Sequence, residues 1–132
     1  MSSVTRFLKG IHIFSSLSKS DLKEVARRLK LEKVKPGDTL CHEGEEGRDL
    51  YIVKSGTCAG SIKLPTGKQK EIVQFHSGDF FGEMAIFENA PRSATCIMKE
   101  KGAIFRLNKE DFFSICESSP DIGTKVMYRM LN

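Results

Sequence analysis

The sequence predicts a mainly β fold, an antiparallel barrel or jelly roll with helices before and after it. Five glycines recur at intervals of 10, 9, 11 and 11 residues, the length of one short strand and one turn: Gly37, Gly47, Gly56, Gly67 and Gly78. Amphipathic helical patterns flank this region on both sides. The 132 residues, 39% of them hydrophobic, are enough for a single domain with its own core.

Two helical segments are expected before the sheet, within residues 4–30. In the first, apolar side chains recur at helical spacing: Val4, Phe7, Leu8, Ile11 and Phe14. The second is predicted over residues 19–30, because Ser18 and Asp21 form the pattern of a capping box and an apolar face begins at Leu22. Residues 1–35 hold nine Lys and Arg against three Asp and Glu. A basic helical face of this kind can dock on an acidic partner, nucleic acid or anionic lipid, although it is more often only solvated.

The sheet is predicted to span residues 31–108. Six short segments with partial alternation lie between its turns: Thr39–Cys41, Asp49–Val53, Cys58–Leu64, Glu71–Phe75, Ser93–Met98 and Gly102–Leu107. Pro65 and Gly67 make the stretch between the third and fourth segments a hairpin tip. The turn region before and at the start of the second segment carries three acidic residues that are expected to be solvated: Glu45, Glu46 and Asp49. This pattern predicts six to eight antiparallel strands.

Two helices are expected after the sheet, within residues 109–131. The segment Lys109–Cys116 has an apolar side that suits packing against a barrel, and Ser119 followed by Pro120 marks a new helix start. The final helix is predicted over residues 120–131, and its apolar residues recur at helical spacing: Ile122, Val126, Met127, Met130 and Leu131. We therefore expect one domain over residues 1–132.

Composition and spacing argue against several classes of function. No apolar run approaches the about 20 residues of a membrane span, and the first residues lack the apolar core of a secretory signal, so a cytoplasmic protein is expected. The four cysteines are far apart and are expected to be reduced: Cys41, Cys58, Cys96 and Cys116. A zinc site built on Cys41, His42 and Cys58 would lack a fourth ligand. The lone His12, His42 and His76 lack the spacing of a cupin metal site, and we expect no metal, no cofactor, no catalytic residue and no enzymatic activity.

The chemically specific stretch is residues 81–95, FGEMAIFENAPRSAT, called the cassette below. Gly82 allows close approach of the backbone to a ligand, Glu83 offers oxygens to sugar hydroxyls, and Arg92 offers a positive fork to phosphate. Between them a short helix can start, with free N–H groups that point at an anion. The alternative is structural: Glu83 and Arg92 form a surface ion pair worth ~0–1 kcal/mol, and Gly82 is only a turn residue.

The cassette resembles that of the cyclic nucleotide-binding domain family, of the cAMP receptor and kinase regulatory subunit type. It matches from Phe81-Gly82-Glu83 to Pro91-Arg92-Ser93-Ala94-Thr95. Further motifs lie at matching intervals, so the resemblance covers roughly residues 12 to 131: Lys35-Pro36-Gly37-Asp38, Leu50-Tyr51-Ile52-Val53, Ser55-Gly56 and Gly78-Asp79-Phe80. It implies an eight-stranded antiparallel β-roll with N-terminal helices and two C-terminal helices.

The resemblance also implies a ligand site. Glu83 would accept a hydrogen bond from the ribose 2′-hydroxyl and Arg92 would pair with the cyclic phosphate. The other implied ligand-binding residues lend backbone amides (Gly82, Met84 and Ala85), close the phosphate site (Ser93 and Ala94), begin the cassette (Phe81) or contact the base from the preceding strand (Ile72 and Val73). Core packing alone would explain Ile72 and Val73 nearly as well. The family has Thr after the cassette Arg in typical cGMP sites and Ala or Ser in many cAMP sites, so Ser93 favours cAMP and leaves cGMP open.

The function implied is that of a regulatory module in signal transduction. Ligand binding would reposition the terminal helices and so control an effector protein or a domain outside this chain, which itself has no DNA-binding motif. The last helix offers lid candidates for the base: Met127, Tyr128, Met130 and Leu131. The competing interpretation is a protein-interaction module that keeps the fold, binds no nucleotide and docks through its basic N-terminal helices.

Overall fold

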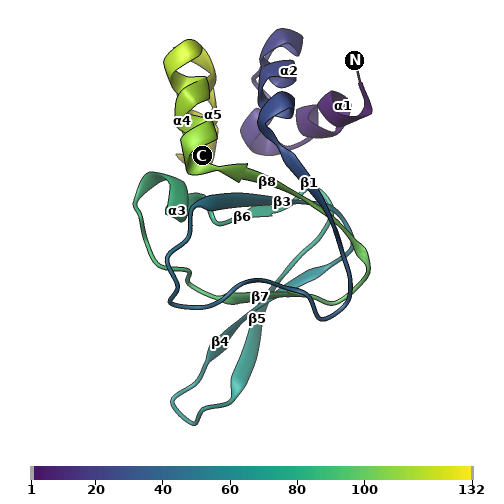
Figure 1. Cartoon of the computed structure of the whole chain (residues 1–132), viewed down its shortest axis with the longest axis vertical. Helices are drawn as coiled ribbons and strands as arrows, with labels where there is room; N and C mark the ends of the chain where they lie inside the picture. The colour runs from purple at the N-terminus through teal and green to yellow at the C-terminus, as the bar shows by residue number, and fades with distance from the viewer. Residues whose placement is uncertain (1, 132) are drawn as a thin grey trace. The chain divides into compact units, whose positions relative to one another are not determined.

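The computed structural model describes residues 2–131, with the side chain of Ala85 outside the described part. The chain divides into two compact units. Unit 1 combines Met1–Leu29 with Leu107–Asn132, and unit 2 is Lys30–Arg106. Unit 1 contains the helices at both ends of the chain, and unit 2 contains the sheets and a short helix (Figure 1). No helix in the described part of the chain is long and apolar enough to cross a membrane.

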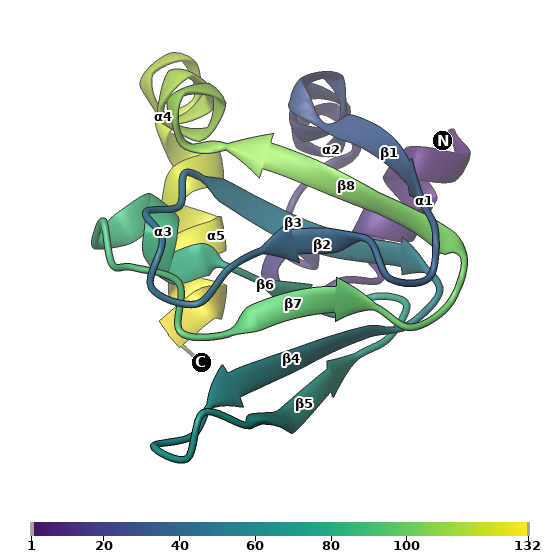
Figure 2. The ribbon, with the colours of Figure 1, turned by 60° about the horizontal axis from the view of Figure 1, so that its bottom comes forward.

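The strands form two four-stranded antiparallel sheets, which confirms the predicted β-roll. The first sheet has the order β1-β8-β3-β6 and the second β2-β7-β4-β5 (Figure 2). Within residues 2–131 the strands are β1 (Lys30–Val34), β2 (Thr39–Cys41), β3 (Asp49–Ser55), β4 (Cys58–Lys63), β5 (Gln69–Phe75), β6 (Phe80–Phe81), β7 (Thr95–Met98) and β8 (Gly102–Asn108). The hairpin tip between β4 and β5 closes through a 2.8 Å hydrogen bond from Leu64 N to Lys68 O.

The interior of unit 2 is filled by alternate side chains of these strands. Tyr51 and Val53 of β3, Cys58 of β4 and Ile104 of β8 belong to one buried apolar cluster, against which Phe75 packs. Period-two alternation explains this cluster, because successive side chains of a strand point to opposite faces of its sheet. Burial of such side chains stabilises the fold by about 1.5–3 kcal/mol each.

Two strands were missing from the six sequence segments. Strand β1 reads Lys-Leu-Glu-Lys-Val and buries only Val34, so its pattern resembles a continuation of the basic helix before it. Strand β6 has only two residues. One of the six predicted segments, Ser93–Met98, was too long, because the strand begins only at Thr95. Together β1 and β6 complete the eight strands that the family resemblance implies.

Unit 1 consists of four α-helices and one short 3-10 helix in its described residues: α1 (Ser3–Lys9), η1 (His12–Phe14), α2 (Lys19–Arg28), α4 (Lys109–Ser118) and α5 (Pro120–Leu131). The capping box before α2 is present, with a 3.1 Å bond from Asp21 N to Ser18 Oγ. The prediction of a helix over 19–30 was wrong at its end: α2 stops at Arg28 and Leu29 is already extended. The single helix expected upstream is divided at Gly10, which caps α1.

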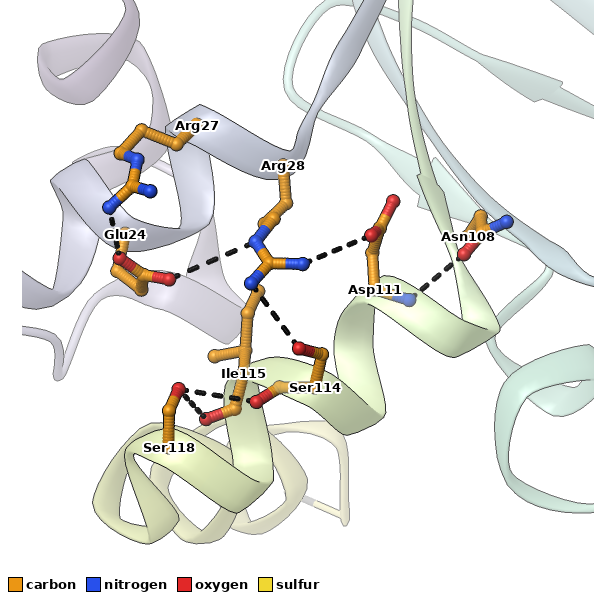
Figure 3. A network of polar contacts seen from close by, with 8 residues as sticks. All are labelled: Glu24, Arg27, Arg28, Asn108, Asp111, Ser114, Ile115 and Ser118. Atoms are coloured by element: carbon orange, nitrogen blue, oxygen red, sulfur yellow. Dashed lines mark hydrogen bonds and ion pairs between the residues drawn. The ribbon is translucent and has the colours of Figure 1, made fainter.

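A polar network joins α2 to α4 within unit 1. The Arg28 guanidinium donates to the Asp111 carboxylate and to the Ser114 hydroxyl, each at 3.2 Å, and also lies 3.9 Å from Glu24 (Figure 3). The side chain of Asn108 caps α4 by accepting a 2.9 Å bond from Asp111 N. The side chains of Arg28 and Asp111 are both 30% exposed, so water screens this ion pair only in part.

Candidate functional site

A cavity of about 310 Å³ lies in unit 2, within the size range of small-molecule sites. Nine of the ten predicted ligand-binding residues line it: Ile72, Val73, Phe81, Gly82, Glu83, Met84, Arg92, Ser93 and Ala94. They come from β5, from β6 and the helix α3 (Glu83–Phe87), and from the loop before β7. The tenth, Ala85, lies within α3, and its side chain is outside the described residues.

Arg92 is the buried cation of this cavity. Only 7% of the residue is exposed, and its Nη2 donates a 3.0 Å bond to the main-chain oxygen of Asp49. Its Nε and Nη1 are buried without a hydrogen-bond partner among the described residues. A buried N–H that lacks a partner costs about 1–3 kcal/mol, more when the group is charged. This guanidinium therefore has two donors and one positive charge to offer a bound anion.

Glu83 is the first residue of α3 and also faces the cavity. Gly82 precedes it as the N-cap, with φ of +88°, a backbone conformation in which a side chain is strained. A Cβ on Gly82 would also overlap Nη1 of Arg92, so glycine is required on both grounds. The Glu83 carboxylate forms no hydrogen bond or ion pair with any described residue, so the structural alternative of a Glu83–Arg92 ion pair is not formed there.

One wall of the cavity is apolar. Ile72 and Val73 of β5 are 52% and 38% exposed, although both line the cavity, so they are not ordinary core residues. Phe81 also lines the cavity and stacks on Phe75 and Tyr51, with ring centroids 4.6 Å and 5.0 Å away. A flat apolar group could cover the exposed side chains while its polar part reached Arg92.

The cassette is tied to the loop between β2 and β3 by main-chain contacts. Arg92 N donates to Glu45 O at 2.9 Å, and Gly44 N donates to Arg92 O at 2.8 Å. Glu46 and Pro91 form an isolated antiparallel bridge next to these bonds. The main chain of Arg92 is therefore held on both sides by this loop.

Two thiols also line the cavity, those of Cys41 and Cys96. The contact of Cys41 with Cys96, together with burial, raises the pKa of the Cys41 thiol far above its ordinary value. The same contact lowers the pKa of Cys96, but its hydrogen bond with Cys58 and its burial outweigh this and raise the pKa to about 12. Both thiols are thus neutral at physiological pH. Both cysteines are free of disulfide bonds, as expected. Among the described residues no cluster of three His, Cys, Asp or Glu could hold a metal ion.

Four residues that hold Arg92 or its neighbours were not predicted. A Cβ on Gly47 would overlap the Arg92 guanidinium, and the Tyr51 ring centroid lies 5.1 Å from Arg92 Cζ. The interpretation of Asp49 as a solvated charge was wrong, because its carboxylate is 24% exposed and pairs with Arg106 at 3.2 Å. Regular spacing marked Gly47 only as a turn, and no sequence signal connects Asp49 with Arg106, 57 residues later.

Comparison with known proteins agrees with this geometry. The model of the cyclic nucleotide-binding domain family matches residues 31–119. A cAMP-dependent protein kinase regulatory subunit of Hypocrea atroviridis is 32% identical over 106 residues, which are 80% of this chain and 22% of that protein. The match therefore spans less than a quarter of that relative's length.

Two solved structures share the fold. The regulatory domain of Toxoplasma gondii PKA, in a co-crystal with cAMP, is 32% identical with a TM-score of 0.78, and the match covers 85% of this chain and 42% of that one. The regulatory subunit of a cAMP-independent protein kinase A from Trypanosoma brucei is 26% identical with a TM-score of 0.79, over 93% and 45% of the two chains. The family model covers more than half of the chain. The chain belongs to the cyclic nucleotide-binding domain family.

Proposed function

We propose that unit 2 binds a cyclic nucleotide, cAMP in preference to cGMP, and that this binding regulates an effector protein or a domain outside this chain. The observation that carries the proposal is Arg92, a buried guanidinium in a cavity wall whose donor nitrogens Nε and Nη1 have no partner among the described residues. A cyclic phosphodiester has one negative charge and free oxygens, so it supplies what this group lacks.

The phosphate would lie between Arg92 and the start of α3. There the main-chain N–H groups of Gly82, Met84 and Ala85 are at or near the helix N-terminus, where N–H groups lack intrahelical acceptors. Ser93 and Ala94, which line the cavity next to Arg92, would close this part of the site. Small side chains at this place leave room for the sugar phosphate.

Glu83 would select the sugar. Its carboxylate lines the same cavity and has no partner among the described residues, so it can accept a hydrogen bond from a ribose 2′-hydroxyl. A bare phosphate or a deoxyribose would leave this acceptor unused. The combination of one acceptor and one buried cation therefore fits a ribonucleotide whose phosphate is closed onto its own sugar.

The base would cover Ile72 and Val73, the exposed apolar side chains of β5. Ser93 follows the cassette Arg, as Ala or Ser does in many cAMP sites of the family, and supports cAMP as the preferred ligand. The similarity to regulatory subunits of cAMP-dependent kinases supports the same choice. We further propose that the module is not catalytic and acts by repositioning the helices of unit 1, as family members do.

A second candidate is a module that keeps the fold and does not respond to cAMP. The similarity to a regulatory subunit of a cAMP-independent kinase favours it. Against it stand Arg92 and Glu83, because a site without an anionic ligand would bury a guanidinium with no partner for two of its donors. The two candidates differ in one measurable property, which is nucleotide affinity.

Isothermal titration of the nucleotide-stripped protein with cAMP and cGMP tests the proposal. We expect micromolar or tighter binding of cAMP, weaker binding of cGMP, and a loss of about 30-fold or more in Arg92→Ala, because truncating a buried charge partner costs about 2–5 kcal/mol. Glu83→Ala should lose binding of cAMP more than of 2′-deoxy-cAMP. Arg27→Ala is the matched control, because its side chain is 72% exposed on α2 and should leave affinity unchanged. A folded, stripped protein that binds neither nucleotide would overturn the proposal in favour of the second candidate.

A further inference from the structure

Two arginines of unit 2 share the same two neighbours. Arg92 and Arg106 place their guanidinium carbons 5.1 Å and 4.9 Å from the ring centroid of Tyr51. Both also bind Asp49, although through different atoms: Arg92 uses the main-chain oxygen at 3.0 Å and Arg106 the carboxylate at 3.2 Å. Only Arg92 lines the cavity.

The charges of the two arginines are balanced differently. Arg106 has two carboxylate partners, since its Nε also lies 2.9 Å from Oε1 of Glu32 and its Nη2 donates to Oε2 at 3.2 Å. Arg92 has no carboxylate partner among the described residues. The main-chain oxygen that accepts from Arg92 belongs to Asp49, so the Asp49 carboxylate is part of the same residue.

A carboxylate on Arg92 would compete with an anionic ligand. An ion pair within 4 Å in a partly buried place lowers the free energy of the unliganded state, and the ligand would have to break it. In this structure the Asp49 carboxylate pairs with Arg106 instead. Arg106 donates to the Asp49 carboxylate through Nη1, which also donates to the Tyr51 hydroxyl at 3.3 Å, and its guanidinium is paired with Glu32 of β1.

We propose that Arg106 is a positioning residue of the anion site: it keeps the Asp49 carboxylate away from Arg92, so that the charge of Arg92 remains available to the ligand. The ligand's identity as a cyclic nucleotide rests on the proposed function, whereas the arrangement of the three side chains does not. Arg106 touches no ligand in this scheme. It acts through Asp49, whose carboxylate it pairs with. Without Arg106 the Asp49 carboxylate should pair with Arg92 and so compete with the anionic ligand.

The test compares four proteins by titration with cAMP. Arg106→Met should weaken binding at least tenfold, because it releases the Asp49 carboxylate. Adding Asp49→Asn should restore affinity to within about threefold of the wild type, because the amide cannot neutralise Arg92. Adding Glu32→Gln instead is the matched control: it removes the other carboxylate partner of Arg106 and the same unit of charge, but leaves Asp49 free, so binding should stay weak.

Two results of the titrations would overturn the proposal. One is a folded Arg106→Met protein that binds cAMP as the wild type does. The other is rescue by Glu32→Gln as complete as rescue by Asp49→Asn, which would show that Arg106 acts only by its charge at a distance. If Arg106→Met does not fold, Arg106→Gln replaces it in the three variants, since the amide still fills part of the space.

A crystal structure of the unliganded Arg106→Met or Arg106→Gln protein gives a readout that needs no nucleotide. We expect the Asp49 carboxylate within 4 Å of the Arg92 guanidinium. If the wild type binds no cyclic nucleotide, the proposed function fails, and this structure alone decides the role of Arg106. An Asp49 carboxylate that stays away from Arg92 without Arg106 would refute the proposal.

Discussion

Replacement of Gly47 by alanine tests whether the close packing of Gly47 against the Arg92 guanidinium fixes the position of that group. The backbone of Gly47 is outside the left-handed region, so alanine is not strained there by conformation. Its Cβ, however, would overlap Nε and Cζ of Arg92 and lie 2.7 Å from Nη2. The overlapped group is the far end of a long side chain. We therefore expect the guanidinium to move and the main chain of the loop to stay.

The two expected effects of Gly47→Ala have different sizes. Displacement of the guanidinium breaks the bond from Arg92 Nη2 to Asp49 O, and hydrogen bonds of charged groups contribute about 1.5–3 kcal/mol. If the ligand loses one such bond as well, its affinity falls by about 10- to 150-fold. Stability should fall by about 0.5–2.6 kcal/mol, because a Gly→Ala change at a compatible backbone gains about 0.4–1 kcal/mol through the unfolded chain and so offsets only part of the loss.

Titration calorimetry with cAMP and thermal denaturation measure the two effects separately. Gly10→Ala is the matched control, because a Cβ there meets only Phe7 O at 3.5 Å in α1, and it should bind as the wild type does. A Gly47→Ala protein with unchanged melting temperature and unchanged affinity would refute the reasoning. It would mean that the position of Arg92 is not set by this contact.

Two further predictions concern stability. Arg28→Met removes the partly buried bonds to Asp111 and Ser114 and should lower the free energy of unfolding, measured by urea denaturation, by about 1–2 kcal/mol. The control Arg27→Met loses only an exposed ion pair within α2 and should lower it by less than about 0.5 kcal/mol. Equal losses in the two variants would contradict the assigned role of the network. The pKa of Cys96 is raised from 9.0 to about 12, so between these values the unfolded chain binds fewer protons than the folded one and the free energy of unfolding should fall as pH rises. Below pH 9 this contribution is constant. Between pH 9 and 11 the free energy of unfolding should decrease less in Cys96→Ala than in the wild type, and an equal decrease would contradict the raised pKa of Cys96.

Local patterns in the sequence predicted the parts of the fold that depend on near neighbours. The capping box of α2, the hairpin tip at Gly67 and the start of α5 at Pro120 were placed correctly. Each depends on residues within a few positions of one another. Strand β1 was missed for the opposite reason, because it buries only Val34 and its pairing with β8 depends on residues about 70 positions later.

The candidate site shows the same division. The cassette is contiguous, so its residues could be named from sequence. The environment of Arg92 is not contiguous: Gly47, Asp49 and Tyr51 come from the preceding loop and β3, and Arg106 from the end of β8. A charged residue in a turn is solvated more often than it is paired, and only the folded sheet shows that Asp49 is the exception.

The division of the chain into two units has a consequence for the order in which it folds. Unit 2 is continuous in sequence, whereas the two parts of unit 1 are joined by contacts such as Ser16 to Arg129 and Arg28 to Asp111, across 113 and 83 residues. During synthesis all of unit 2 emerges from the ribosome before α4 and α5 do. The contacts of α2 with α4 and of η1 with α5 therefore form only after unit 2 has emerged, so we expect the sheets to form before unit 1 does.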